Sequence, residues 1–310
     1  MAEIIHAIMN RSKAYPGFWH AVLLCVTFVM LQVCLLMPFG ILDAIFKLHL
    51  GSHPAVLGVV NLIACALVLI MGRLIGRLPM PEVFALHHVS GLAVVGVIIA
   101  SGGAIILLSE ADNLVRAVLP PPEWIVRILR DLSSSSEHVW ASVFLLVIVA
   151  PMTEELMFRG LILRGFLRRF KVVGALVLSS ILFGAVHLNP WQFISAAGLG
   201  LMFAWWHART QSLIPSLLGH ALANATVVGH QSLPIKIRGF NAGESFGGTE
   251  LQPFWFDALG LLLLAAGLWL FRVATPPIKA RVEPSDAQLP PPDSPVCEAP
   301  PVIPTDGAAS

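Results

Sequence analysis

Long apolar stretches separated by short polar segments form the dominant pattern of this 310-residue chain. A helix that crosses a bilayer needs roughly 20 mostly apolar residues, and eight stretches approach that length and composition. The pattern therefore predicts an all-α membrane protein, a bundle of about eight transmembrane helices. The eight stretches are residues 18–41, 55–72, 88–109, 138–160, 172–188, 191–207, 212–229 and 254–271.

The polar segments divide the chain into four predicted parts. Segment 110–136 is too polar to cross a bilayer, but its apolar residues recur at helical spacing, so we expect it along the membrane interface. The end of the chain is rich in Pro, Ala, Asp and Ser, which is typical of disorder. The parts are 1–136, the N-terminal transmembrane helices and interfacial segment; 137–230, a helical core with most of the unusual polar residues; 231–275, a Gly-rich loop and the last transmembrane helix; and 276–310, a disordered Pro-rich tail.

Composition narrows the class of protein further. Charged residues make up 12% of the chain, whereas a soluble domain has about 25%. The net charge of +1 is too small to indicate a nucleic-acid-binding protein. The low charged content makes the lipid bilayer the expected environment. The four cysteines have neither a disulfide-framework nor a zinc-knuckle spacing, and we expect them to be small buried apolar residues.

The distribution of basic residues predicts the orientation, because cytoplasmic loops carry an excess of Lys and Arg. With eight spans and a cytoplasmic N-terminus, twelve of the 19 Lys and Arg residues fall on the cytoplasmic side and six on the other, with Arg159 inside a span. Both termini are therefore expected in the cytoplasm. The N-terminus lacks a short apolar core followed by a small-residue cleavage site, so we interpret the first apolar stretch as a retained anchor.

Two adjacent glutamates, Glu154 and Glu155, interrupt the fourth apolar stretch. A charged side chain at the bilayer centre costs about 2.5–3.5 kcal/mol, so an ionisable residue there indicates a functional site. Glu155 and Arg159 are four residues apart with the glutamate first, which is the favourable order for an ion pair on a helix. Glu154 points about 100° away from Glu155. Glu155 is therefore predicted to be neutralised, and Glu154 is free to act as a general acid or base.

Two later stretches carry polar pairs at the same spacing. Phe183 and His187 lie on one helix face, and a lone histidine there is more often satisfied by a backbone carbonyl than used in chemistry. His220 and Asn224 also share a face. They could join two helices by hydrogen bonds, or they could be two donors aimed at one oxyanion.

The three polar groups are expected at similar depth in the membrane. Glu154 lies 17 residues before the basic turn at Lys171, and His187 lies 16 residues after it. His220 lies 11 residues beyond Arg209, the next predicted cytoplasmic turn, or about 16 Å along a helix. This agreement favours one shared, water-filled site.

The ordered motifs EExxxR, FxxxH and HxxxN on successive helices resemble those of the CPBP family, which includes CAAX prenyl endopeptidases and bacterial bacteriocin-processing homologues. The resemblance covers about 137–230. It implies an eight-helix intramembrane endopeptidase in which Glu154 and His187 activate a water and His220 and Asn224 stabilise the oxyanion. Glu155 and Arg159, with Phe183, would support the site.

Other interpretations of the same residues stay open. Glu154, His187 and His220 could hold a zinc ion, or they could activate water without a metal. Intramembrane Glu and His residues also suit a proton-coupled transporter, and the chain could be a catalytically silent scaffold or immunity protein. As a peptidase, it would act on a membrane-associated protein or peptide near its C-terminus or membrane-proximal region. A bacterial plasma (inner) membrane is the expected location.

Overall fold

The described part of the computed structural model comprises residues 15–77, 79–127, 139–229, 232–242 and 250–278. It belongs to the unit Met1–Ile278; the second unit, Lys279–Ser310, lies outside the described residues, as does the predicted disorder of the tail. The described residues are helical apart from loops and one isolated bridge between Arg238 and Ala242. The fold is therefore all-α, as predicted.

All eight apolar stretches form helices. The elements are α2 (Phe18–Phe46), α3 (Pro54–Gly76), α4 (Met80–Val83), α5 (Gly91–Val118), α7 (Val139–Val143), η1 (Phe144–Val149), α8 (Ala150–Glu155), η2 (Leu156–Leu163), α9 (Arg164–Leu167), α10 (Val172–Ala185), α11 (Pro190–Thr210), α12 (Ile214–Gly229) and α13 (Phe254–Ala274). The five consecutive elements from α7 to α9 form one continuous helix, Val139–Leu167, called the long helix below.

Five of the described helices are long and apolar enough to cross a membrane: α2, α3, α5, the long helix and α13. The eight predicted spans are thus confirmed as helices but not all as spans. α10 and α12 have 14 and 16 residues, short of the roughly 20 that a bilayer requires. α11 has 21 residues, but its sequence contains Gln192, His207 and Arg209.

The third helix is longer than the predicted span 88–109, because α5 continues to Val118. Its last turns contain charges that pair within the helix: Arg116 lies 2.6 Å from Asp112. Asn113 bonds both Glu110 and the carbonyl of Gly239, which ties this end of α5 to a loop. Local pairing lets a helix continue through a sequence that is too polar to cross lipid.

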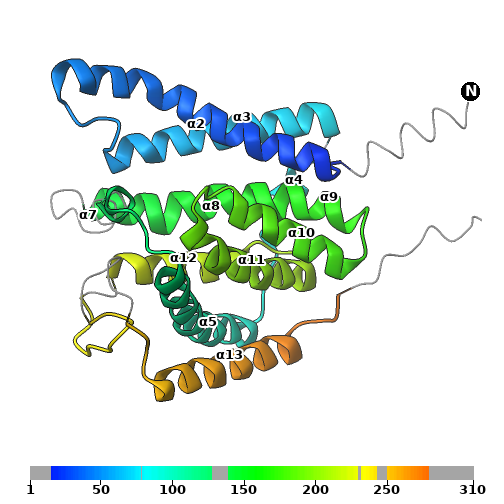
Figure 1. Ribbon diagram of the computed structural model, residues 1–310. Coiled ribbons are helices and arrows are strands. Elements are labelled where there is room, and N and C mark those ends of the chain that lie inside the picture. The colour runs from blue at the N-terminus through cyan, green and yellow to red at the C-terminus, as the bar shows by residue number, and fades with distance from the viewer. Residues whose placement is uncertain (1–14, 78, 128–138, 230–231, 243–249, 279–310) are drawn as a thin grey trace, which may run out of the picture. The chain divides into compact units, whose positions relative to one another are not determined.

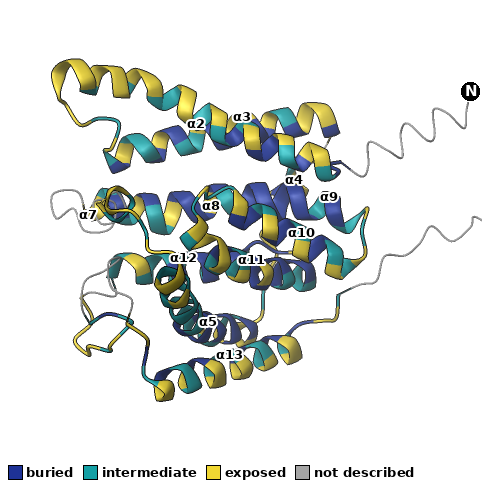
Figure 2. Ribbon diagram, viewed as in Figure 1, coloured by how far each residue is buried: buried dark blue, intermediate teal, exposed yellow. Residues whose placement is uncertain are grey.

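The helices lie in successive layers (Figure 1). α2 and α3 form a hairpin along one side of the long helix; α10, α11 and α12 lie on its other side, and α13 packs on α5 beyond them. The α5–α13 contact is close because both helices present glycines: Gly103 approaches the backbone of Leu264, and Gly267 that of Ala100. α2 and α13 have few buried residues, whereas the long helix is mostly buried (Figure 2).

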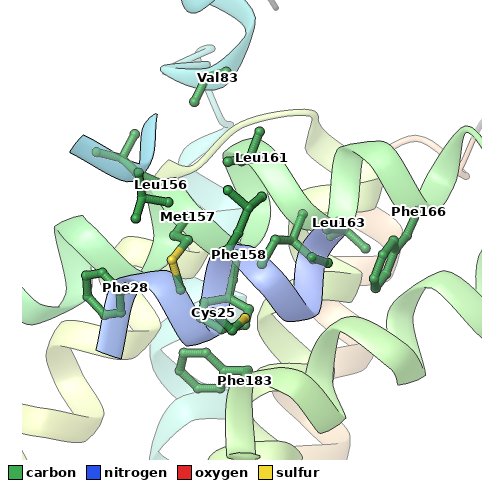
Figure 3. Packing of buried hydrophobic residues seen from close by; sticks show 14 of the residues in the cluster. Cys25, Phe28, Val83, Leu156, Met157, Phe158, Leu161, Leu163, Phe166 and Phe183 are labelled. Carbon is green, nitrogen blue, oxygen red and sulfur yellow. The ribbon is translucent and has the colours of Figure 1, made fainter. Parts of the chain in front are cut away.

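The core surrounds the C-terminal half of the long helix. Met157, Phe158 and Ile162 are fully buried there, and Phe166 continues the same cluster (Figure 3). α3 contacts this helix through small side chains: the Cys65 thiol lies 3.5 Å from the Thr153 carbonyl. Every residue of η2 is buried, so protein rather than lipid surrounds this segment.

The cysteines follow the prediction in part. Cys25 and Cys65 are buried, whereas Cys34 is exposed on α2, where lipid rather than protein would cover it. Cys297 lies outside the described residues.

Candidate active site

The site begins with a proline that distorts the long helix. Pro151 lies in the first turn of α8 and has no N–H, so it cannot donate to the helix turn before it. That turn, η1, has the wider π geometry, in which each N–H bonds the carbonyl five residues earlier, as Ala150 does with Leu145. Pro151 thus leaves the carbonyl of Leu146 without a helical partner.

Asn224 of α12 supplies the missing donor, because its side-chain amide lies 2.7 Å from the Leu146 oxygen. Of the two roles left open for His220 and Asn224, this contact matches helix-to-helix bonding for Asn224. The amide has a second N–H, so an oxyanion role for it stays a prediction.

Glu155 and Arg159 form the predicted ion pair. The Arg159 Nε lies 3.1 Å from a Glu155 carboxylate oxygen, and both side chains have zero exposure. A second Arg159 nitrogen donates to the carbonyl of Gly200 at 2.9 Å, and the guanidinium lies 4.6 Å from the centre of the Phe183 ring. A buried charge pair needs such additional partners, because each ion loses its hydration.

His220 joins this ion pair from α12. Its Nδ1 lies 2.9 Å from the Glu155 carboxylate, and its ring stacks on Phe203 at 5.4 Å. The carboxylate can only accept, so the Nδ1 proton is directed to it and Nε2 is left to face the opposite way. Glu155 therefore orients the His220 ring and also neutralises the charge of Arg159.

Glu154 lies beside the free edge of this histidine. One of its carboxylate oxygens is 3.8 Å from the His220 Nε2 and has no hydrogen-bond partner among the described residues. The distance is too long for a direct hydrogen bond but fits two groups that touch the same water. The predicted contrast between a paired Glu155 and an unpaired Glu154 matches this geometry.

The described contacts of His187 are with Phe183 at the end of α10 rather than with the glutamates. α10 ends at Ala185, and the His187 Nδ1 lies 2.8 Å from the carbonyl of Phe183 at the end of that helix. Among described contacts, Glu154 meets His220 rather than His187. The Phe183 ring contacts both imidazoles edge-on, at 5.2 Å for His187 and 5.6 Å for His220. Phe183 therefore packs against both histidines.

Three partners of the site were missed from the sequence. Ser216 is buried and interacts with Glu155; it lies four residues before His220, so the helical spacing could have indicated it. Gly200 acts through its backbone carbonyl, which accepts from Arg159, and a backbone contact of this kind leaves no signal in the sequence. Phe203 carries no sequence signal, because an aromatic residue in an apolar helix is ordinary.

The donors described here do not fit the zinc site that the sequence left open. Within the described residues, no group of three or more His, Cys, Asp or Glu side chains is arranged to hold a metal ion. His220 directs its Nδ1 to Glu155, and His187 directs its Nδ1 to a carbonyl. A zinc site of three protein ligands would require them to converge, so no step below passes through a metal.

The segment that contains this site has a known family counterpart. Residues 136–226 match the family described as type II CAAX prenyl endopeptidase Rce1-like. This segment, which includes all seven predicted site residues, is therefore an Rce1-like domain of the CPBP family, and the protein is an integral membrane protein.

A curated relative matches the chain over a similar length. The chain is 30% identical over 89 residues to the "Putative membrane peptidase YdiL" of Bacillus subtilis (strain 168). The match covers 29% of this chain and 36% of the relative, so the chain spans about a third of the relative's length. No solved structure matches the chain.

Proposed function

We propose that the protein is an intramembrane endopeptidase that hydrolyses a peptide bond with a water activated by Glu154. The observation that supports it most is the buried, unpartnered oxygen of Glu154, 3.8 Å from a histidine that Glu155 and Arg159 hold in place. A buried polar atom without a partner is costly, and such groups cluster at functional sites. The family of the segment 136–226 adds independent support.

In the proposed reaction, one water lies between Glu154 and the His220 Nε2. Its oxygen attacks the scissile carbonyl while its proton passes to Glu154, and the same proton then goes to the leaving nitrogen as the C–N bond breaks. Glu155 keeps the imidazole oriented, as a carboxylate does in other catalytic His pairs. In this proposal His220 takes the place next to Glu154 that was predicted for His187. Asn224 stays a predicted donor to the oxyanion, and in this proposal His187, predicted to activate the water, supplies the second donor instead.

The substrate class follows from the location of the site. Glu154 lies within a membrane-spanning helix, so we propose a membrane-associated protein or peptide, cut near its C-terminus or its membrane-proximal region. The proposed setting is a bacterial plasma membrane, with both termini cytoplasmic.

Comparative peptide mass spectrometry of cells that produce the wild type or Glu154→Ala tests this function. We expect a set of peptides that appears only with the wild type, because the variant lacks the base. The Cys34→Ala variant, changed at an exposed position on α2, is the matched control and should give the wild-type set. Identical peptide sets from the wild type and Glu154→Ala would contradict the proposal. Proton-coupled solute flux lost in Glu154→Ala would instead support a transporter.

A further inference from the structure

A short connection between α3 and α5 contacts both helices that carry the site. We call residues 82–87 the brace. Val83 is buried in the same cluster as Leu161 (Figure 3). A Cβ added at Gly160 would lie 2.5 Å from the Val83 carbonyl oxygen, so the brace backbone rests directly on the long helix. This contact is one residue beyond Arg159.

The other end of the brace holds the turn from which α12 begins. The Ala85 carbonyl accepts a hydrogen bond from the Leu213 N–H at 2.8 Å. The His87 carbonyl accepts one from the Ser212 hydroxyl at 2.7 Å, and Ser212 is fully buried. α12 starts at Ile214 and carries His220 less than two turns later.

The brace also has an ion pair, but its buried contacts contribute most of its attachment to the long helix and α12. Glu82 pairs with Arg164 and lies 3.5 Å from Arg168, with roughly half of the Glu82 side chain exposed. Exposed pairs of this kind contribute about 0–1 kcal/mol. The Gly160 contact and the hydrogen bonds to the turn before α12, at Gln211, Ser212 and Leu213, therefore fix the brace.

We propose that the brace positions His220 against Glu155, so that Gly160 and Ser212 are positioning residues of the site. The inference rests on the proposed function. The Glu155–His220 bond joins two helices at 2.9 Å, and displacing either helix by 1 Å breaks it. The brace touches the long helix just after Arg159 and touches α12 just before its first residue. It thus sets the relative position of the two helices at the end where they meet.

Four variants of the full chain test this role: Gly160→Ala, Ser212→Ala, the two combined, and Gly102→Ala as control. Gly102 is also a helical glycine, but nothing lies within 4 Å of an added Cβ there. The probe is a synthetic peptide that reproduces one of the Glu154-dependent cleavages. Cleavage rates give kcat and KM, and intrinsic tryptophan fluorescence on heating gives the Tm of each variant.

We expect Gly160→Ala to lower kcat about tenfold with KM nearly unchanged, since a misplacement of 1 Å can cost up to about a hundredfold in rate. Ser212→Ala should lower kcat about threefold, because the bond to the His87 carbonyl and the bond from the Ile214 N–H are both lost. The combined variant should be no slower than Gly160→Ala within about twofold, because both changes release one brace and so are not additive. Gly102→Ala should match the wild type.

The possible outcomes separate the brace from the proposed function. Wild-type kcat in folded Gly160→Ala and Ser212→Ala would overturn the brace. Fully multiplicative losses in the combined variant would do so too, since they indicate two unrelated local effects. If Gly160→Ala does not fold, Ser212→Ala alone decides through its kcat. A wild-type protein that cleaves no Glu154-dependent peptide contradicts the proposed function itself.

Discussion

The long helix and α13 are similar in sequence character but lie in different surroundings. Both are long and apolar enough to cross a membrane, yet the most apolar window of the long helix is 56% buried in protein and that of α13 only 22%. α13 has its charges in its first and last turns, at Asp257 and Arg272, where they can reach the membrane surface. The long helix has Glu155 and Arg159 in its interior at zero exposure. Charges can lie within a span where neighbouring helices supply their partners.

The largest expected effect comes from removing one member of the buried pair. Arg159→Met leaves the Glu155 carboxylate without its cation and the Gly200 carbonyl without its donor. Breaking a buried pair costs about 3–5 kcal/mol, so we expect a large fall in the free energy of unfolding. Denaturant unfolding in detergent, followed by tryptophan fluorescence, measures it.

A matched double variant controls that prediction. Glu155→Leu with Arg159→Met removes both charges, and it should recover part of the lost stability because no buried ion is left unpaired. If Arg159→Met unfolds at the same denaturant concentration as the wild type, the buried pair does not hold the long helix in place.

A smaller expected effect, on stability, distinguishes the long helix from α13 without changing a charged residue. Leu163 of the long helix is fully buried, whereas Leu262 of α13 is 68% exposed. Leu163→Ala should cost about 2–5 kcal/mol, because it leaves a cavity in packed protein. Leu262→Ala should cost less than about 0.5 kcal/mol, since lipid tails can fill the space. Equal losses from the two substitutions, measured by the same unfolding assay, would mean that α13 is not lipid-facing.

The sequence could predict what depends on local spacing. Apolar length located all eight helices, and the interval of four residues identified the Glu155–Arg159 pair. The helix containing Glu154 and the motif carrying His220 were also identified. These features are local because each depends on a single helix and its 3.6-residue period.

The rest depends on how separate helices pack. The unmatched carbonyl of Leu146 follows from Pro151, but nothing in the sequence says that Asn224 would reach it. The contact between Glu154 and His220 joins the long helix to α12, and residue counts along single helices could not predict which helices would meet there.

The central claim is that the two adjacent glutamates have separate tasks, Glu154 in chemistry and Glu155 in holding the site together. The most direct measurement compares Glu154→Gln with Glu155→Gln, for both the Tm and the yield of Glu154-dependent peptides at equal protein levels. We expect Glu154→Gln to keep the wild-type Tm and to lose cleavage, whereas Glu155→Gln should lower the Tm because Arg159 stays buried without its partner. A folded Glu154→Gln variant that still produces the peptides would contradict the account.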